Sequence, residues 1–372
     1  MKLTRGNIGV VFKHKTFVVG TLYFHSQISI ANGGGPLWQN VSITAGATTN
    51  GGLVFPANSQ SLTYDADGNL TFDGIWNYSW DAANRLVSMN MTNISGIAPS
   101  NRLRLDFAYD NMNRRVSKVV WTNSTGSTFV PQATNYFIYD GWNLIAVFNP
   151  AGTVQQSFLW GNDLSGTMAN AGGIGGLLAM ANSGTNYFAT YDGNGNITGL
   201  INGADKSTGA RYEYSPLGEA LRATGPMAKV NPFRFSTKFC DDESGLVNYG
   251  YRYYSPTIGR WLGRDSAGEQ KGGDNLFVFC NNSSINFVDN DGRIATAAYW
   301  WNVIYTMEKG IAQAEAMGEE DTVERLQGLW SKACIQFAKA CANEEAVGGI
   351  AEGFDEGTAL LGGVAIGPLA VC

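Results

Sequence analysis

The sequence predicts a mainly β protein, in which a stacked antiparallel sheet of short strands is followed by a small α-helical module at the C-terminus. Three observations predict this fold: a composition rich in glycine and aromatic residues, a recurring aromatic-aspartate pair, and a change of residue pattern after Ile294. Of the 372 residues, 47 are glycine, Trp, Tyr and Phe number 10, 16 and 19, and 15% are charged. This composition favours short strands joined by tight turns, with aromatic side chains in the buried surface.

An aromatic residue followed by aspartate recurs along the chain, and Asn or Gly follows within a few residues. We expect the aromatic side chain to end a strand and pack on the neighbouring strand, and the aspartate to cap the backbone of the turn. Asn or Gly would then take the left-handed backbone conformation that such a turn requires. The copies are Tyr64-Asp65 with Gly68, Trp80-Asp81 with Asn84, Tyr109-Asp110 with Asn113, Tyr139-Asp140 with Asn143, Tyr191-Asp192 with Gly195, and the weaker Tyr214-Ser215 with Gly218.

Between these turns, apolar and polar residues alternate with the period of two that is typical of half-buried strands. In the clearest example, which begins at Arg102, one face of the expected strand carries Leu103, Leu105, Phe107 and Tyr109. A single hairpin cannot bury its apolar face, so each strand pair must stack on the next. The repeats therefore predict a continuous antiparallel sheet.

The residue pattern changes after Ile294. Residues 297–317 and 321–346 are rich in Ala, Glu, Met and Gln, with apolar residues three to four positions apart. This spacing predicts two helices, and Gly318 marks the break between them. No catalytic constellation is recognisable in residues 294–372, so this module is either a small toxin of unassigned activity or a truncated or decayed one.

Charge and hydropathy narrow the classes of partner. The net charge of −6 leaves no basic field that could neutralise phosphates, so nucleic acid is not expected as a partner. The apolar run at residues 16–24 is short and follows no small-residue cleavage site, so no secretory signal is visible. Residues 358–372 are apolar but too few to span a bilayer as a helix. The chain begins like the middle of a strand-rich protein, which suggests a fragment.

The sequence predicts no cofactor and no metal. The five cysteines are irregularly spaced without a CxxC pair, which favours reduced thiols, although Cys334 and Cys341 would share a helix face and leave a bridge or a metal pair open. The glycine cluster at residues 172–176 lacks the ending of a phosphate-binding loop. His14 and His25 are the two histidines and lie upstream of the repeats, which disfavours a Ser-His-Asp or Cys-His mechanism.

The spacing Tyr-Asp-x-x-Gly-Asn-Leu/Ile-Thr resembles the YD repeat of bacterial Rhs proteins, insecticidal toxin-complex C subunits and animal teneurins. It is present at residues 64–71 and varied at residues 80–87. More specific is an ordered string that is similar to the Rhs-associated core and runs over residues 231–292. It contains NPFRF at 231–235, RYYSP at 252–256, GRWL at 259–262 and NLFVF at 275–279.

This resemblance implies a spiralling antiparallel YD-repeat sheet wound into a hollow shell, of which this chain would form a partial β-shell. The core would close one end and precede a variable C-terminal module, often a toxin. We therefore divide the chain into an N-terminal strand-rich segment of incomplete repeats (1–59), YD repeats (60–230), the Rhs-associated core (231–293) and a variable helical module (294–372). The expected partners are an upstream Rhs shell or partner repeats and an immunity protein, in a longer protein that is exported or on the cell surface.

The resemblance also implies a site. In many Rhs cores, two aspartates assisted by an arginine release the C-terminal module by self-cleavage just after the core. The matching positions are Arg252, Asp265 and Asp289, and the cut would follow Arg293. Two carboxylates held close together cannot both ionise cheaply, so one can polarise the scissile carbonyl while the other activates water.

Two expectations concern the geometry of this site. Arg252 alternates out of phase with Tyr249, Tyr251 and Tyr253, so in a regular strand it would point away from this aromatic stripe and reach a carboxylate. A turn at residues 272–273 would let two adjacent strands bring the two aspartates together.

Departures from the family pattern bear on whether cleavage survives. Ser266 and Asn290 stand where the family usually has proline after each aspartate, and Arg293 stands where a leucine normally precedes the cut. A charge placed in an apolar pocket that suits leucine should weaken cleavage. The alternative is an uncleaved, structural core in which Asp265 and Asp289 cap turns.

The rival function is that of a non-catalytic surface or adhesion repeat protein that binds glycans or neighbouring cells. Aromatic rings such as those of Tyr249, Tyr251 and Tyr253 can stack on sugars, although cross-strand core packing is the commoner use of such a stripe. As an enzyme, the chain would at most be an aspartyl peptidase that acts once on itself.

Overall fold

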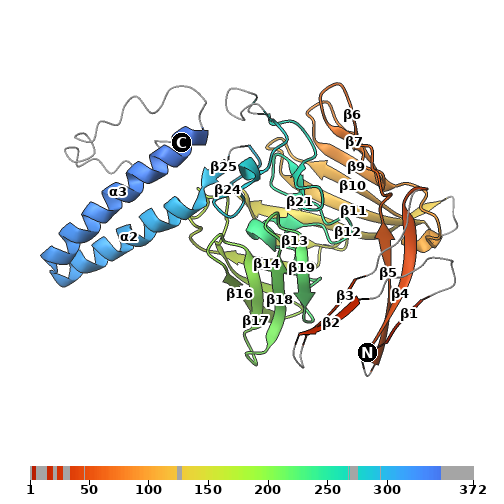
Figure 1. The fold of residues 1–372 in the computed structure, drawn as a ribbon, viewed down its shortest axis with the longest axis horizontal. Helices are drawn as coiled ribbons and strands as arrows, with labels where there is room; N and C mark the ends of the chain where they lie inside the picture. Colours follow the sequence, from red (N-terminus) through yellow and green to blue (C-terminus); the bar gives the residue numbers. More distant parts are fainter. Residues whose placement is uncertain are drawn as a thin grey trace. The chain divides into compact units, whose positions relative to one another are not determined.

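The computed structural model describes residues 2–5, 15–19, 23–27, 34–45, 47–123, 128–266, 268, 275–293 and 295–344. Its contacts divide the chain into two compact units, residues 1–107 with 118–134 and residues 108–117 with 135–372. Strands make up most of the regular structure, and two helices follow them in the chain (Figure 1). The predicted fold class, a mainly β antiparallel sheet with a small helical C-terminal part, is confirmed.

The largest sheet contains 14 strands, β6 to β19, and each strand pairs with the next one along the chain. This order is the strand-by-strand stacking that the repeats predict. The strands are β6 (Thr63–Tyr64), β7 (Leu70–Phe72), β8 (Trp76–Trp80), β9 (Leu86–Met91), β10 (Leu103–Tyr109), β11 (Arg115–Asn123), β12 (Phe129–Asp140), β13 (Asn143–Phe148), β14 (Val154–Trp160), β15 (Leu177–Asn182), β16 (Thr185–Tyr191), β17 (Ile197–Asn202), β18 (Thr208–Tyr214) and β19 (Ala220–Thr224).

Smaller sheets lie before and after the large one in the chain. At the N-terminus, β1 (Lys2–Arg5), β4 (Leu37–Ala45) and β5 (Ala47–Phe55) form one sheet, and β2 (Lys15–Val19) pairs with β3 (Tyr23–Gln27). After β19, a four-stranded sheet contains β20 (Phe239–Cys240), β21 (Val247–Asn248), β22 (Tyr253–Ser255) and β23 (Arg260–Trp261), and β24 (Phe287–Asp289) pairs with β25 (Ala295–Ala297). Single turns of 3-10 helix are η1 (Pro99–Asn101), η2 (Phe235–Thr237) and η3 (Cys280–Asn282).

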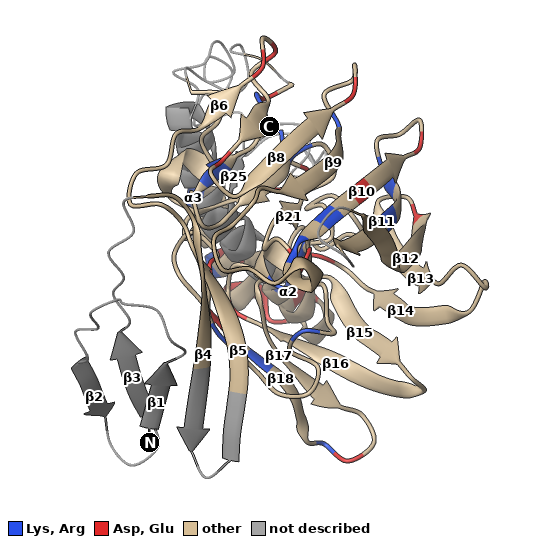
Figure 2. Ribbon diagram, turned by 90° about the vertical axis from the view of Figure 1, so that its right-hand side faces the viewer, with Lys and Arg blue, Asp and Glu red and all other residues tan. Residues whose placement is uncertain are grey.

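The predicted alternation along the strands is present in β10. Leu105 and Phe107 are buried, Asp106 between them is half-buried, and Arg104 and Ala108 on either side of the pair are exposed. In Figure 2, the tips of several hairpins are red, and the ribbon of β10 carries both blue and red bands. Strands of this kind bury one face and leave the other in solvent.

The turn chemistry predicted for the aromatic-aspartate pairs is confirmed at most copies. In the β8–β9 turn, the Oδ1 atom of Asp81 accepts the N–H groups of Ala83 and Arg85 at 2.9 and 3.0 Å. Asn84 then takes the left-handed conformation, with φ +57°. The turns after Tyr64, Tyr109 and Tyr191 repeat this pattern of an aspartate acceptor followed by Gly or Asn at positive φ.

Two turns differ from those predicted from the aromatic-aspartate pairs. At Asp140, the hairpin closes through two residues, and Asp140 pairs directly with Asn143 across the β12–β13 ladder, so the turn between them is shorter than in the other copies. At Asn149, a further copy escaped the pattern because Asn replaces Asp. Its Oδ1 atom accepts the N–H groups of Ala151 and Thr153 at 3.0 and 2.9 Å, with Gly152 at φ +76°.

The aromatic residues that end alternate strands form a ladder. Each donates a hydrogen bond from its ring N–H or hydroxyl group to the backbone carbonyl at the start of the preceding strand, so the ring is fixed at both its apolar body and its polar tip. The pairs are Trp80 with Leu70 at 2.8 Å, Tyr139 with Arg115 at 2.9 Å, Trp160 with Leu144 at 2.7 Å, Tyr191 with Leu177, and Tyr214 with Ile197 at 2.7 Å.

In the second unit, the chain after β19 packs on the buried face of the sheet. The ring of Phe233 lies edge-on to Phe158 and Trp160, with centroids 4.9 and 5.1 Å away. Met227 and Ala228 belong to the same cluster of buried residues. This segment therefore covers the apolar face of the strands against which it packs in this unit.

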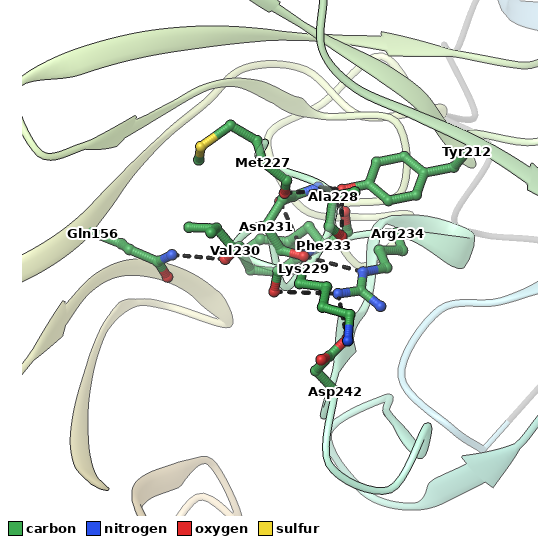
Figure 3. Close-up of polar contacts among 10 residues, drawn as sticks. All are labelled: Gln156, Tyr212, Met227, Ala228, Lys229, Val230, Asn231, Phe233, Arg234 and Asp242. Atoms are coloured by element: carbon green, nitrogen blue, oxygen red, sulfur yellow. Dashed lines mark hydrogen bonds and ion pairs between the residues drawn. The ribbon is translucent and has the colours of Figure 1, made fainter. Parts of the chain in front are cut away.

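Asn231 is the first residue of the string that resembles the Rhs-associated core, and its hydrogen bonds hold the start of this segment in place (Figure 3). The Asn231 side chain donates to the carbonyl of Phe233 at 2.5 Å and accepts the Phe233 N–H at 3.1 Å. Arg234 donates to the Asn231 carbonyl at 3.1 Å and pairs with Asp242 at 2.9 Å. Because Asn231 is fully buried, these bonds satisfy groups that have no access to water.

The two C-terminal helices were predicted to within three residues. Helix α2 spans Ala298–Met317 and helix α3 spans Glu320–Glu344, and they break at Gly318. The indole of Trp330 donates to Glu308 at 3.2 Å, which joins the two helices. Residues 345–372, including the expected apolar tail, lie outside the described residues. In the part of the chain that the structure describes, none of the helices has both the length and the hydropathy needed to cross a bilayer.

Candidate functional site

Arg252, Asp265 and Asp289 come from three separate places in the second unit and meet in its interior. Arg252 lies in a bend just before β22, Asp265 lies in the loop after β23, and Asp289 is the last residue of β24. All three are buried. The structure thus brings together the three residues that the family resemblance singles out.

The guanidinium of Arg252 lies between the two carboxylates. Its Nη2 atom is 2.7 Å from Oδ2 of Asp265 and 3.6 Å from Oδ2 of Asp289, so those two oxygens are no farther apart than the sum of these distances. The Nη1 atom donates to the Leu276 carbonyl at 3.2 Å, and Nε donates to the Gly292 carbonyl. Every nitrogen of the guanidinium therefore has a partner, as a buried cation requires.

A bend in the backbone, rather than a regular strand, directs Arg252 to the carboxylates. Gly250 has φ +105°, and the chain from Gly250 to Arg252 is irregular. The expectation of an alternating strand is therefore wrong here, because a glycine in this conformation breaks the period of two. Arg252 still reaches a carboxylate, and the plane of its guanidinium lies 4.2 Å over the ring of Trp261.

The three tyrosines do not form a stripe, for the same reason. Tyr249 packs in a buried aromatic cluster, with its ring centroid 5.1 Å from that of Trp261. The hydroxyl group of Tyr253 contacts that of Tyr109 at 3.0 Å and accepts a hydrogen bond from the Arg115 guanidinium at 3.2 Å. Only Tyr251 is half exposed, and its ring contacts Trp142 with centroids 5.1 Å apart. These rings offer no flat aromatic platform for a glycan.

The two aspartates were expected on adjacent strands, and this expectation is also wrong. Asp265 is in a loop, where its N–H donates to the Leu276 carbonyl at 3.1 Å. The partner of β24 is β25, so Asp289 pairs with Ala295 across a hairpin. The turn expected at residues 272–273 lies outside the described residues.

Asp289 combines a network of backbone hydrogen bonds with complete burial. Its Oδ1 atom accepts the N–H groups of Asp291, Gly292 and Arg293 at 3.2, 2.6 and 3.1 Å. Burial nevertheless raises the pKa of Asp289 to about 6, against the opposing effects of the Arg252 charge and of these hydrogen bonds. Burial also lowers the pKa of Arg252, although both aspartates oppose this shift.

Lys238 was missed by the sequence reading, and it clamps the loop that follows Asp289. Its Nζ atom donates to the carbonyls of Asn290 and Gly172 at 2.5 and 2.7 Å. Burial lowers the pKa of Lys238 to about 8, while Asp291, Asp289 and Asp163 act to raise it. Phe235 and Phe239 lie near Lys238 in the sequence, but Ser236 and Thr237 are polar, so no local pattern indicates that this lysine is buried.

Gly172, from the glycine cluster, makes the other half of this clamp. It has φ +62°, and a Cβ atom added there would lie 1.9 Å from the Asn290 carbonyl oxygen. The side chain of Asn290 also donates to the Asn170 carbonyl at 3.1 Å. The cluster was read as a turn before a strand, and β15 does follow it, but its closest contact is with the loop after Asp289.

The bond that the resemblance marks for cleavage lies in the β24–β25 hairpin. Asp289 and Ala295 are paired across this hairpin, so the loop between them contains Arg293. Ile294, on the far side of the bond, lies outside the described residues. The helical module is thus joined to the core through a short antiparallel pair.

Arg293 does not occupy an apolar pocket. Its Nε and Nη2 atoms lie 2.9 and 2.5 Å from Oδ2 of Asp291. Its guanidinium also lies 3.9 Å over the ring of Tyr251. Arg293 stands where the family pattern has leucine, and its positive charge was expected to be unfavourable there. The charge instead has a carboxylate and an aromatic face as partners.

A cavity of about 280 Å³ borders this loop. The residues that line it include Asn290, Asp291, Lys238 and Trp142. Arg252, Asp265 and Asp289 do not line it. The cavity therefore adjoins the loop at Asn290 and Asp291 and does not reach the ionisable cluster.

Other candidate groups contribute little to this site. Within the described ranges, no set of three His, Cys, Asp or Glu side chains could hold a metal ion. Cys240 and Cys280 are thiols outside any disulfide. The side chains of Cys334, Cys341 and His25 are beyond the described part of the chain, as are Cys372 and His14 entirely.

Comparison with known proteins places these observations in a family. Residues 50–275 match the model of the teneurin YD-shell. The tRNA3(Ser)-specific nuclease WapA of Bacillus spizizenii is 28% identical over 242 residues, which are 63% of this chain and 9% of WapA. Toxin subunit YenC2 of Yersinia entomophaga is 45% identical over 51 residues, 14% of this chain and 5% of the subunit.

Among solved structures, the complex of TcdB2 with TccC3 is similar over 69% of this chain and 13% of that chain, with 19% identity and a TM-score of 0.47. The chain spans about a tenth or less of the length of the two relatives named above. The relatives are much longer proteins, and their names include a nuclease and a toxin subunit.

Proposed function

We propose that this chain, which belongs to the teneurin YD-shell family, forms the closing end of a longer β-shell and cuts itself once after Arg293 to release its helical module. The observation that carries this proposal is the meeting of Arg252, Asp265 and Asp289 beside the loop that holds the expected bond. The shell is homologous to toxin proteins, which makes a C-terminal cargo the natural candidate for release.

The chemistry assigns different work to the two carboxyl groups. Asp289, whose pKa is raised to about 6 by burial, is the group that carries a proton at mildly acidic pH. In its acid form it would protonate the carbonyl oxygen of Arg293. Asp265, which is paired with Arg252, would take a proton from water as the water oxygen bonds to the carbonyl carbon.

The tetrahedral intermediate would then break its carbon–nitrogen bond. The nitrogen of Ile294 takes up the proton held by Asp265, and the proton on the former carbonyl oxygen returns to Asp289. The products are a carboxyl group on Arg293 and an amino group on Ile294. Both aspartates end in their starting protonation states, so one water molecule is consumed and no cofactor is needed.

Mass spectrometry of the purified chain tests the cut. We expect fragments of 293 and 79 residues (372 − 293), and a single intact species from Asp265→Asn and from Asp289→Asn. Asp67→Asn is the matched control, because Asp67 is exposed in a repeat turn and should leave cleavage unchanged. An intact wild-type chain after prolonged incubation at mildly acidic pH would contradict the proposal.

Two partners follow from the same reading. Because this chain is a small part of the length of its relatives, we propose that upstream repeats of a longer shell stack on it. An immunity protein would bind the released module if that module is toxic. Expression of residues 294–372 alone tests the second partner, because a module that needs an immunity protein should arrest the growth of a host that lacks one.

A further inference from the structure

The turn that contains Asp289 shares two side-chain hydrogen bonds with the turns of the repeats and adds a third, from the Gly292 N–H. In the repeat turns, Oδ1 of Asp81 accepts the N–H groups two and four residues later, at Ala83 and Arg85. Oδ1 of Asp289 likewise accepts those of Asp291 and Arg293, at 3.2 and 3.1 Å. An arginine stands four residues after the aspartate in both turns.

The arginine side chain takes different directions in the two turns. In the repeats it returns to its own aspartate: Arg85 Nε donates to Asp81 Oδ2 at 2.7 Å, and the same contact joins Arg114 to Asp110 at 2.8 Å. Arg293 instead contacts Asp291 and the ring of Tyr251. The spacing shows that a guanidinium at this position is long enough to reach the aspartate four residues before it.

We propose that Asp291 and Tyr251 are positioning residues, which hold the Arg293 guanidinium away from Asp289 so that Asp289 can carry the proton that cleavage needs. A guanidinium in contact with Asp289 would favour its ionised form, as Arg85 does for Asp81. Asp291 supplies the competing carboxylate, and Tyr251 supplies the ring face. This inference rests on the proposed self-cleavage for its consequence, but not for its geometry.

The charges around Asp289 set how far this effect can go. Arg252 lies 3.6 Å from its Oδ2 atom and favours the ionised form, whereas Asp291 disfavours it. Asp265 faces the same guanidinium, and Lys238 approaches from the clamp on the Asn290 carbonyl. Removing Asp291 would therefore act in two ways, by removing a like charge and by releasing Arg293, and the experiment must separate them.

A double-mutant cycle separates the two effects. The pKa of Asp289 is measured by carbon-13 NMR of labelled aspartate carboxyl groups, in the full chain carrying Asp265→Asn so that no cleavage occurs. The Asp289 signal is the one lost in Asp289→Asn. We expect Asp291→Asn to lower this pKa by about one unit or more when Arg293 is present, and by clearly less in the Arg293→Gln background.

Equal shifts in the two backgrounds would overturn the inference, because only the loss of the Asp291 charge would then be acting. Tyr251→Leu removes the ring that the Arg293 guanidinium contacts, but it removes no carboxylate charge. It should therefore also lower the Asp289 pKa, and only when Arg293 is present. Asp67→Asn is the control for a distant charge and should leave the pKa unchanged.

The cleavage assay gives a second reading. With Asp265 intact, Asp291→Asn should move the pH profile of self-cleavage to lower pH, and adding Arg293→Gln should return it toward the wild-type position. A wild-type chain that stays intact would sink the proposed function while the NMR cycle still decides the inference. A chain that cuts normally with no coupling in the cycle would sink the inference alone.

Discussion

The repeat turns and the turn at Asp289 use one hydrogen-bond pattern in two environments, and the environments reverse its effect. Partial burial pulls the pKa of Asp81 upward, but hydrogen bonds from Arg85 and Ala83 and the Arg85 charge lower it overall. Asp289 accepts three backbone N–H groups and still has its pKa raised to about 6 by burial. Desolvation therefore outweighs hydrogen bonding once the turn leaves the surface.

The comparison teaches how a structural turn can become a reactive one. The pKa of the aspartate in such a turn can be raised without a change in the backbone. The turn must be buried, and the arginine four residues after the aspartate must bind another group. The chain around β22 and β23 supplies part of this cover, because it places Arg252 and Asp265 against the turn.

The largest expected difference between the two environments concerns the arginine partner. Arg252→Met leaves two buried carboxyl groups without a cation, which should cost about 3–5 kcal/mol of unfolding free energy. Arg85→Met removes a surface pair, with Arg85 and Asp81 side chains 28% and 24% exposed, and should cost about 0–1 kcal/mol. Urea denaturation of both full-length variants measures the difference. Equal losses would mean that the buried cluster is already solvated.

Gly172 and Gly152 allow the same two environments to be compared through substitutions that affect the backbone. Gly172→Ala combines a left-handed backbone with a Cβ atom 1.9 Å from the Asn290 oxygen, and should cost about 2–4 kcal/mol. Gly152→Ala, in a repeat turn with φ +76° and nothing within 4 Å, should cost about 1–2 kcal/mol for conformation alone. Thermal denaturation of the two variants compares them. A Gly172→Ala loss no greater than that of Gly152→Ala would show that the clamp can relax.

The pH dependence of stability should have opposite signs in the two turns. The folded pKa of Asp289, about 6, lies above its unfolded value of about 3.9, so the folded state binds the extra proton between them. Asp289 therefore destabilises the fold progressively as pH rises through this window, by about 3 kcal/mol in total. The folded pKa of Asp81 is lowered, so its contribution to stability is lost as pH falls. Asp289→Asn and Asp81→Asn should change the slope of stability against pH in opposite directions.

Local chemistry was predictable from the sequence, and long-range chemistry was not. The turns after Trp80 and Tyr109 depend on residues within five positions, so their hydrogen bonds could be predicted from spacing alone. The break between the helices at Gly318 is local in the same sense. The copy at Asn149 does not contain the aromatic-aspartate pair that predicts the other turns, although the Asn amide oxygen accepts the same bonds.

The candidate site needed contacts between distant segments, which spacing does not encode. The resemblance named Arg252, but the bend at Gly250 that directs it was read as a regular strand. Lys238 reaches Asn290 across 52 positions, so no local pattern announces this contact. Asp291, which pairs with Arg293, lies two residues away in the sequence, so this contact is local. The contact of Arg293 with the ring of Tyr251 joins distant positions and could not be predicted from spacing.

The smallest expected effect concerns the aromatic ladder, which both units share. Trp80→Phe and Trp160→Phe each remove one indole donor to a backbone carbonyl, at Leu70 and Leu144, and should each cost about 1 kcal/mol. Trp160 also contacts Phe233 of the closing segment, with ring centroids 5.1 Å apart. Replacement by Leu should therefore cost more at Trp160 than the loss of the donor alone, since it also removes the edge-on ring pair, worth about 0.5–1.5 kcal/mol. Urea midpoints of the three variants measure these differences, and equal Phe and Leu losses at Trp160 would mean that the contact between Trp160 and Phe233 contributes nothing.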